Sequence, residues 1–269
     1  MKHFLLQSLV FACLAVGLSA CASSLPPGTS TAADADKLLM DRGTQALADE
    51  KWLGARQYFT KLLDSYPQSA FRADAKLGVG DSYLGENTSG SYVFALNEYR
   101  EFLSYYPTNP RADYAQFQLG LVHYKQMLAP GRDQTETKDA INEFQTFVDR
   151  YPNSKMMTEG RTHLRAAKDR LADAEYSVGM TYLRIRWYAG AIGRFKPLLE
   201  DKEYTRKDAV YFYLAEALEK SGTEAGKAEA LPYYGRLVDE YAESEYLEKA
   251  KARIELLKAA VPAAGLQAP

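Results

Sequence analysis

Cysteine and histidine are side chains that proteins often use for nucleophilic or acid–base catalysis and for transition-metal binding, and this chain has few of them. Its 269 residues include two cysteines and three histidines. His123 stands where the surrounding helical pattern otherwise carries an aromatic residue, which predicts a packed side chain. His163 lies among Arg161, Arg165 and Lys168, and this charged neighbourhood predicts a solvated helix face.

Nothing else in the sequence completes a site for chemistry. Neither histidine has a second histidine or a carboxylate at the spacing that metal ligands usually show. The chain also lacks the glycine-rich phosphate loop of nucleotide-binding enzymes. We therefore predict no catalytic residue, no metal site and no bound cofactor. The sequence indicates a binding protein rather than an enzyme.

The first residues have the pattern of a bacterial lipoprotein signal peptide. Lys2 and His3 precede an apolar run from Phe4 to Leu18 that is too short to span a membrane as a permanent helix. The run ends in small residues followed by Cys21. We expect residues 1–20 to be removed and Cys21 to carry a diacylglycerol on its sulfur and an acyl chain on its amino group. An ordinary signal peptide with an incidental cysteine is the alternative.

The residues around Cys21 bear on where the protein is held. Cys13 would leave with the signal peptide and Cys21 would be blocked by lipid, so the mature chain would have no thiol for a disulfide or a metal. Lipoproteins kept in the inner membrane commonly have aspartate after the cysteine; Ala22 stands there instead, which favours the outer membrane. Residues 21–33 are mostly small residues and prolines, and we expect a flexible tether.

Beyond this tether one helical pattern recurs. Ala140, Phe144 and Phe147 share one helix face, and Pro152 ends the helix because the residue before a proline is pushed out of the α region. In every copy an aromatic residue is followed by apolar residues three and four positions later. The other copies begin at Phe59, Tyr99, Phe195 and Tyr234.

The first copy has the spacing of the tetratricopeptide repeat, with Gly43, Ala55, Phe59 and Pro67 at the expected positions. The small residues allow the paired helices to approach closely, and the aromatic residue fills the gap between one pair and the next. Copies two, three and five contain insertions at the turn, and copies four and five lack the closing proline. We predict an all-α fold, a right-handed solenoid of helical hairpins with about five tetratricopeptide-like repeats.

This pattern divides the chain into segments. Residues 34–153 would form repeats one to three. Residues 154–260 would form a long helix from Lys155 to Arg186, repeats four and five, and a capping helix with a polar outer face. Residues 261–269 would form a disordered tail.

Charge and tyrosine content bear on the kind of partner. The 33 basic and 35 acidic residues give a net charge of −2, which argues against a nucleic-acid partner held by bulk electrostatics. The 20 tyrosines fit either of two roles. They could be packed knobs between stacked helices, or a ligand surface, since tyrosine suits interfaces.

Several stretches, together with the motif at Cys21, resemble the BamD family, lipoproteins of the outer-membrane β-barrel assembly machine. They are residues 132–135 (Arg-Asp-Gln-Thr), residues 151–154 (Tyr-Pro-Asn-Ser) and the block 168–195. The resemblance extends from about residue 34 to residue 257. It departs from the family at residues 202–204, where a further Tyr-Pro is common, so the end of the fourth repeat is expected to be irregular.

The resemblance implies a lipid-anchored scaffold on the periplasmic face of the cell outer membrane. Its C-terminal half would dock on the barrel-forming subunit and on accessory lipoproteins. Its N-terminal half would meet unfolded outer-membrane β-barrel clients through an extended segment that ends in an aromatic residue. Arg194 matches the family arginine that meets the barrel-forming subunit, and a bidentate bridge to a partner carboxylate would suit it. A solvated surface charge is the alternative.

The client segment would lie in a groove lined by the first helix of each pair. The residues at this position in repeats one to three are Met40, Thr44, Leu47, Leu77, Asp81, Leu84, Tyr114, Phe117, Leu121 and Tyr124. An apolar groove that bears tyrosines suits an extended peptide with an aromatic terminus. Burial between the helices is the alternative for Leu77 and Leu84.

A lipoprotein that pilots secretin or pilus components, or that organises peptidoglycan enzymes, is a function of a different class. Such proteins also combine a lipidation motif with tetratricopeptide repeats. They do not share the pattern of residues 168–195.

Overall fold

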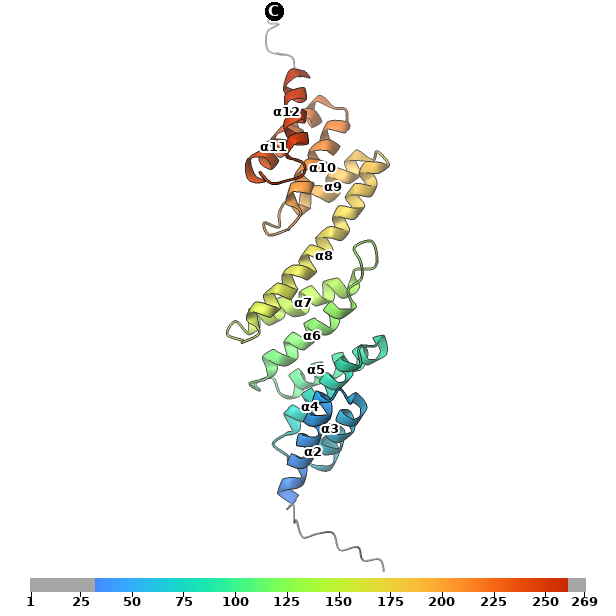
Figure 1. Ribbon diagram of the computed structural model, residues 1–269, viewed down its shortest axis with the longest axis vertical. Coiled ribbons are helices and arrows are strands. Elements are labelled where there is room, and N and C mark those ends of the chain that lie inside the picture. Colours follow the sequence, from blue (N-terminus) through green and yellow to red (C-terminus); the bar gives the residue numbers. More distant parts are fainter. Residues whose placement is uncertain (1–31, 261–269) are drawn as a thin grey trace, which may run out of the picture.

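The structure, a computed structural model, describes residues 32–260, where helices joined by short loops are the only regular secondary structure (Figure 1). The elements are α2 (Ala32–Ala48), α3 (Trp52–Ser65), α4 (Arg72–Glu86), α5 (Ser89–Tyr105), α6 (Ala112–Gln126), α7 (Thr135–Arg150), α8 (Met157–Arg184), α9 (Tyr188–Leu198), α10 (Lys207–Lys220), α11 (Glu224–Glu240) and α12 (Leu247–Ala260). This confirms the all-α prediction.

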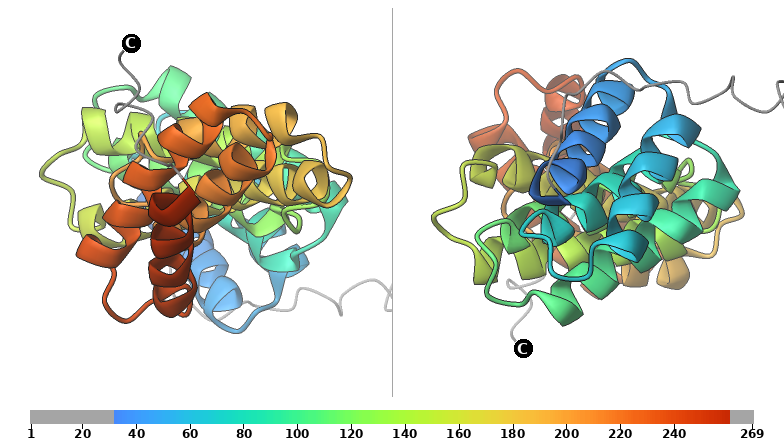
Figure 2. Two further views of the ribbon diagram at one scale, coloured as in Figure 1. Left: turned by 90° about the horizontal axis from the view of Figure 1, so that it is seen from above. Right: turned by 90° about the horizontal axis from the view of Figure 1, so that it is seen from below.

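Each helix packs mainly against its neighbours in the sequence, so the molecule is a stack rather than a globule. Figure 1 shows the stack running in sequence order from α2 at one end to α12 at the other. Seen along the long axis, the helices of successive pairs point in different directions around it (Figure 2). A stack of helix pairs that contact only adjacent pairs is the solenoid that the repeats predicted.

The repeat glycines lie directly beneath the repeat aromatic rings. A Cβ atom added at Gly43 would lie 2.5 Å from Phe59 Cε1, and one added at Gly78 would lie 2.4 Å from Phe59 Cε2. Phe59 is therefore held between the first helix of its own pair and the first helix of the next pair. Tyr99 meets Gly80 in the same way, as Phe144 does Gly120 and Phe195 does Gly179. The predicted role of the aromatic residue is confirmed.

The turn that closes each pair is set by one backbone conformation. Tyr66, Tyr106 and Tyr151 precede prolines and end their helices with φ near −125° to −128° and ψ between 52° and 70°. Tyr241 adopts the same conformation although alanine follows it. The fourth pair departs from this pattern, because α9 stops at Leu198 and the next residue stays right-handed. Its end is irregular, as expected.

The long helix predicted between Lys155 and Arg186 is confirmed as α8, which has 28 residues. Its first half packs against α7, where Gly160 lies under Phe147, and its second half packs against α9, where Gly179 lies under Phe195. The two halves belong to separate hydrophobic clusters. α8 therefore joins an N-terminal stack to a C-terminal stack.

Several predictions fall outside the described residues: the signal peptide, Cys21 with its lipid, most of the tether, and the tail at 261–269. The last two residues predicted for the tether, Ala32 and Ala33, belong to α2. No helix between residues 32 and 260 has the length and apolar character needed to cross a membrane.

Candidate functional site

Four of the predicted groove residues, Leu47, Asp81, Leu84 and Tyr114, meet in one concavity of the N-terminal stack. It has a volume of about 430 Å³. We call it the N-terminal pocket. Its lining comes from α2, α3, α4 and α6 and from the turn after α4: Leu47, Trp52, Asp81, Leu84, Gly85, Asn87, Tyr114, Gln118 and Lys125.

Asp81 organises the polar side of this pocket. Its Oδ1 accepts hydrogen bonds from the hydroxyls of Tyr99, at 2.7 Å, and Tyr114, at 2.9 Å. Burial raises the pKa of the Asp81 carboxyl, while the two hydroxyls and the charge of Arg111 oppose the rise. Among the described residues, no hydrogen bond reaches Asp81 Oδ2.

The two tyrosines are held as neutral donors. Burial raises the pKa of Tyr99 and that of Tyr114, and the nearby charge of Asp81 adds to both shifts. A contact from the Gln118 side chain to the Tyr114 hydroxyl opposes the rise at Tyr114. Because the Tyr114 hydroxyl already donates to Asp81, the Gln118 amide N–H must be the donor in that contact. The Gln118 carbonyl oxygen is buried and has no partner among the described residues.

The apolar side of the N-terminal pocket is formed by Trp52 with Leu47 and Leu84. Trp52 lies against Gly85, where an added Cβ would come within 2.6 Å of the indole ring. A glycine at this point lets the indole approach the end of α4. Leu84 is 8% exposed, and Lys125 is an exposed cation at the rim.

The other predicted groove residues are distributed differently. Thr44 is exposed, and Met40 and Leu121 are partly buried against the hydrophobic clusters. Phe117 was placed in the groove wrongly: it is only 4% exposed and packs edge-on against Phe144 and Phe147.

Tyr124 also packs inward. Its ring centroid lies 4.5 Å from that of His163 and 6.3 Å from that of Phe144. Leu77 is 0% exposed, so it is buried between the helices, which was the alternative to a place in the groove. Leu84 is buried as well and still contributes to the pocket wall.

Both histidines in residues 32–260 are packed. His123 is buried as predicted, and its Nδ1 lies 2.7 Å from Glu136 Oε2. The prediction for His163 was wrong: its ring stacks on Phe144, at 5.4 Å and 21° between planes, because α8 turns this position toward α7. Each of these histidines therefore has a carboxylate neighbour. The neighbour of His163 is Glu159, at 3.6 Å, and the sequence prediction missed this pair. No group of three potential metal ligands occurs in residues 32–260.

Arg194 lies on a second surface, in the C-terminal stack. It is exposed on α9 and points away from the packed Phe195, as predicted. Its Nη1 lies 2.7 Å from Glu175 Oε2 on α8, and both side chains are 43% exposed. Glu175 in turn lines a concavity of about 420 Å³ between α8 and the loop before α7. Arg132 and Lys138 line the same concavity, which we call the junction pocket.

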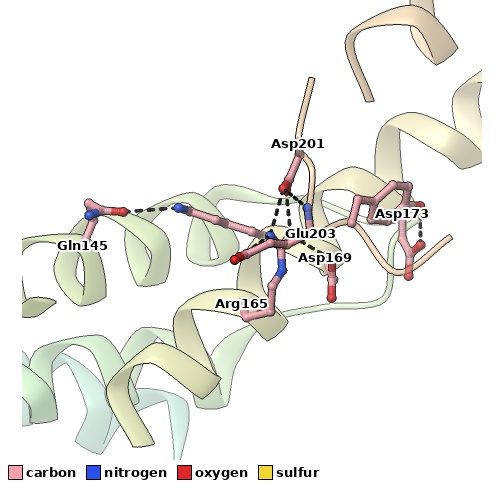
Figure 3. A network of polar contacts seen from close by, with 8 residues as sticks. Gln145, Arg165, Asp169, Asp173, Asp201 and Glu203 are labelled. Atoms are coloured by element: carbon pink, nitrogen blue, oxygen red, sulfur yellow. Dashed lines mark hydrogen bonds and ion pairs between the residues drawn. The ribbon is translucent and has the colours of Figure 1, made fainter. Parts of the chain in front are cut away.

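A polar network holds the middle of α8 to the irregular loop after α9 (Figure 3). Arg165 contacts Asp169 on its own helix at 2.8 Å and Asp201 on the loop at 2.7 Å. Asp173 accepts a hydrogen bond from the Tyr204 hydroxyl at 2.7 Å. Lys168 donates to Gln145 on α7 at 3.2 Å. The network therefore links α7, α8 and the loop at the point where the two stacks meet.

Sequence reasoning missed Trp52, Asn87, Gln118 and Lys125 in the N-terminal pocket. Gln118 and Lys125 follow Tyr114 at four and eleven positions, which is one helix face. The prediction followed the apolar residues of α6 instead. That face is the one that packs against α7.

Comparison with known proteins agrees with this architecture. A family model described as YfiO, outer membrane lipoprotein, matches residues 32–231. The outer membrane protein assembly factor BamD of Caulobacter vibrioides is 31% identical over 170 residues, covering 63% of this chain and 54% of that protein. The same factor in Neisseria gonorrhoeae is 25% identical over 212 residues, covering 72% of this chain and 76% of that protein.

The matched region of this chain spans little more than half the length of the Caulobacter relative. The family match, in contrast, covers most of the helix stack, from the first residue of α2 into α11. The resemblance seen in residues 132–135, 151–154 and 168–195 is thereby confirmed. This chain belongs to the YfiO family of outer membrane lipoproteins.

Proposed function

We propose that this chain is a lipid-anchored scaffold of the β-barrel assembly machine, held on the periplasmic face of the outer membrane. It would help to fold and insert outer-membrane β-barrel proteins through protein–protein contacts, without catalysis. The observation that carries this proposal is the family match across residues 32–231. The relatives named above are called outer membrane protein assembly factors.

The anchor in this proposal is Cys21, which would carry the diacylglycerol and the N-acyl chain. Anchoring through the first residue of the mature chain leaves the whole stack free in the periplasm. The N-terminal pocket would receive an extended segment of an unfolded client. Its apolar wall and its hydrogen-bonding groups suit a peptide that fixes one side chain in a concave site.

The surface around Arg194 would dock on the barrel-forming subunit, and neighbouring parts of the C-terminal stack on accessory lipoproteins. Arg194 is exposed, and its guanidinium is already oriented by Glu175. Arginine presents a planar set of donors that matches a carboxylate. A carboxylate of the partner could therefore join or replace Glu175 at little cost in side-chain entropy.

The test is Arg194→Glu, which places a like charge against the expected partner carboxylate. We expect at least tenfold less barrel-forming subunit to co-purify from detergent-solubilised membranes, because like-charge juxtaposition across an interface costs several kcal/mol. Arg100→Glu makes the same charge change at an exposed position of α5, in the other stack, and should leave the amount of co-purified subunit unchanged. Helix content by circular dichroism should stay native in both variants.

A charge swap separates the partner contact from the internal ion pair. The double variant Arg194→Glu, Glu175→Arg restores an ion pair between α8 and α9 with reversed polarity. If Arg194 acts on the partner, co-purification stays low in the double variant. Full recovery would show that only the internal pair matters, and normal co-purification of the single variant would contradict the docking site itself.

A further inference from the structure

The turn between α8 and α9 exposes two large apolar side chains beside unpaired cations. Ile185 is 63% exposed and Trp187 is 54% exposed. Arg184 and Arg186 adjoin Ile185 in the sequence, and within the described part of the chain their guanidinium groups have no ion pair or hydrogen bond. We call residues 184–188 the corner. Figure 1 shows it at the outer edge of the stack, where α8 ends.

The corner is held in one conformation by local contacts. Arg186 has a φ of 63°, in the left-handed region that non-glycine residues seldom adopt. The backbone N–H of Trp187 donates to the Tyr182 carbonyl at 2.8 Å and closes the turn. The Trp187 ring lies 4.5 Å from the Tyr182 ring and against Gly190, where an added Cβ would come within 2.7 Å of the indole. The indole is therefore fixed by packing on one side and exposed on the other.

The corner and the end of α10 form a cationic concavity. It has a volume of about 360 Å³ and is lined by Met180, Leu183, Arg184, Arg186, Tyr188 and Lys220. This lining includes three cations and no carboxylate. Lys220 is paired with Glu216 on its own helix, which leaves the two arginines without a counterion. Guanidinium groups form charge-assisted hydrogen bonds with phosphate oxygens. The concavity therefore favours an anionic group such as a phosphate.

The shape and composition of the corner favour a lipid surface over a protein partner. A stable protein interface buries about 800 Å² on each side, and a turn that exposes two apolar side chains supplies little of that area. The boundary of a bilayer requires less. Tryptophan rings lie at headgroup level there, and arginine places its apolar stem along the lipid while its charge stays near the headgroups. The corner combines both kinds of side chain within five consecutive residues.

We propose that the corner is a second contact with the membrane, in which Trp187 and Ile185 enter the headgroup region and Arg184 and Arg186 bind lipid phosphates. The inference rests on the proposed function, because it assumes that the chain is anchored through Cys21. It adds to the anchor a contact made by the folded stack itself. Such a contact fixes how the stack is turned toward the bilayer, which a lipid on a tether does not.

The length of the tether keeps the stack close to the bilayer. Residues 22–31 are the whole link between Cys21 and α2. A link of this length spans at most about 40 Å when fully extended. A stack tethered so closely at one end can lie along the bilayer, and a turn at its outer edge then reaches the lipid.

The test uses the full, lipidated chain, because the sequence has only two tryptophans. Trp52→Phe leaves Trp187 as the single indole, and Trp187→Phe leaves the indole of the N-terminal pocket. Each variant is reconstituted into vesicles of phosphatidylethanolamine and phosphatidylglycerol, with or without bromine on the acyl chains as a contact quencher. We expect bromine to lower the emission of Trp187 at least about twofold, since interfacial tryptophan borders the acyl chains. The emission of Trp52 should be unchanged.

The outcomes separate this inference from the proposed function. Flotation of the chain with the vesicles reports the anchor, and a chain that does not float would overturn the role of Cys21 and this inference with it. A chain that floats while Trp187 stays unquenched would overturn the contact at the corner alone. Equal quenching of both tryptophans would show that the whole chain adheres to the lipid without orientation, which also overturns the inference.

The competing assignment of the corner is the subunit docking surface, because Tyr182 contacts Arg194 as well as Trp187. Vesicles that also contain the barrel-forming subunit distinguish the two. If the emission of Trp187 is insensitive to bromine and changes only when the subunit is present, the corner belongs to the protein interface. That result would overturn the membrane contact.

Arg184→Glu tests the cations in the chain that keeps only Trp187. It replaces an attraction to anionic headgroups by a repulsion, so the quenching should fall by at least about half. Arg161→Glu is the matched control on the same helix, also exposed and also without an ion pair in the described part of the chain. It should keep the full quenching. Unchanged quenching in Arg184→Glu, with native helix content, would overturn the assignment of the concavity to lipid phosphates.

Discussion

At the scale of single residues, the stack depends on glycines that leave room for aromatic rings. Gly179 on α8 lies under Phe195 of α9, and Phe195 is fully buried. Interiors are packed so closely that one added methyl group must displace something. Here the obstacle is the face of a ring that is itself held on its other side. The ring cannot rotate away without opening the core.

Gly179→Ala is therefore expected to destabilise the protein by about 1–3 kcal/mol, the usual cost of overpacking a core. An added Cβ would lie 2.5 Å from Phe195 Cε1. The control is Gly193→Ala on α9, where nothing lies within 4 Å of the added atom. That change should stabilise by about 1 kcal/mol, because alanine is the better helix former. Urea unfolding followed by circular dichroism measures both, and equal midpoints would contradict the packing argument.

At the scale of elements, α8 is fixed to the loop after α9 by charged groups in addition to the packing of Tyr204 in the hydrophobic cluster of Tyr176. Arg165 pairs with Asp201, and the hydrogen bond between them holds the pKa of that carboxyl below its usual range, against the effect of burial. The pair replaces the Tyr-Pro turn that closes the first three repeats. This is why the fourth pair can end irregularly and still be held in place.

The pair predicts a defined pH dependence. The pKa of Asp201 is lower in the folded state than in the unfolded state. The stability that this carboxylate contributes is therefore fully present above the unfolded-state pKa of about 4 and is lost as the pH falls through the folded-state pKa. Asp201→Asn should cost roughly 0.5–1 kcal/mol at pH 7. The difference from the parent should persist to about pH 5 and shrink below pH 4.

Urea midpoints measured between pH 3 and pH 7 check this. The control is Asp133→Asn. The pKa of Asp133 is also lowered, but this residue lies in the loop before α7, away from the loop after α9, and accepts a hydrogen bond from the Thr135 backbone N–H. Faster amide exchange in residues 199–206 is expected for Asp201→Asn alone. A stability difference that grows toward low pH would contradict the assigned direction.

At the scale of the whole molecule, the two stacks are joined by α8, with separate hydrophobic clusters on either side of its middle. Figure 1 shows α8 running obliquely between them. The N-terminal pocket and the surface of Arg194 lie in different stacks. Their separation and relative direction are therefore fixed mainly by the straightness of this one helix.

Ala172→Pro should change that geometry and leave each stack intact. Proline removes a helical hydrogen bond and clashes with the preceding turn, which kinks or breaks the helix. Spin labels at Tyr105→Cys and Leu256→Cys, both on exposed positions, report the distance between the stacks in a chain whose own two cysteines are replaced by serine. We expect one narrow distance distribution in the parent and a broad one in the variant.

Ala172→Ser is the matched control and should keep the narrow distribution. Circular dichroism should show the loss of little more than one helical turn in Ala172→Pro. A collapse of helix content throughout the chain would mean that the stacks cannot fold independently of a continuous α8. An unchanged distance would mean that other contacts hold the stacks together.

The sequence by itself determined the helix pairs, their order and the family. Helical spacing, glycine–aromatic pairs such as Gly43 with Phe59, and prolines after Tyr66 and Tyr106 are local signals, and local signals survive in a stack whose contacts are mostly between neighbours. The long α8 followed from an uninterrupted helical segment. Arg194 was placed on the exposed side because it adjoins a packed aromatic residue.

Only the tertiary structure decided which face of each helix is open. Phe117 and His163 were assigned to exposed faces, and both pack between α6, α7 and α8. One position of helix is a rotation of about 100°, and composition alone does not fix which of two apolar faces meets the partner helix. The pocket of Asp81, Tyr114 and Gln118 joins residues from several helices. Which polar groups face this pocket depends on how each helix is rotated about its own axis. The spacing of residues within a single helix does not determine that rotation.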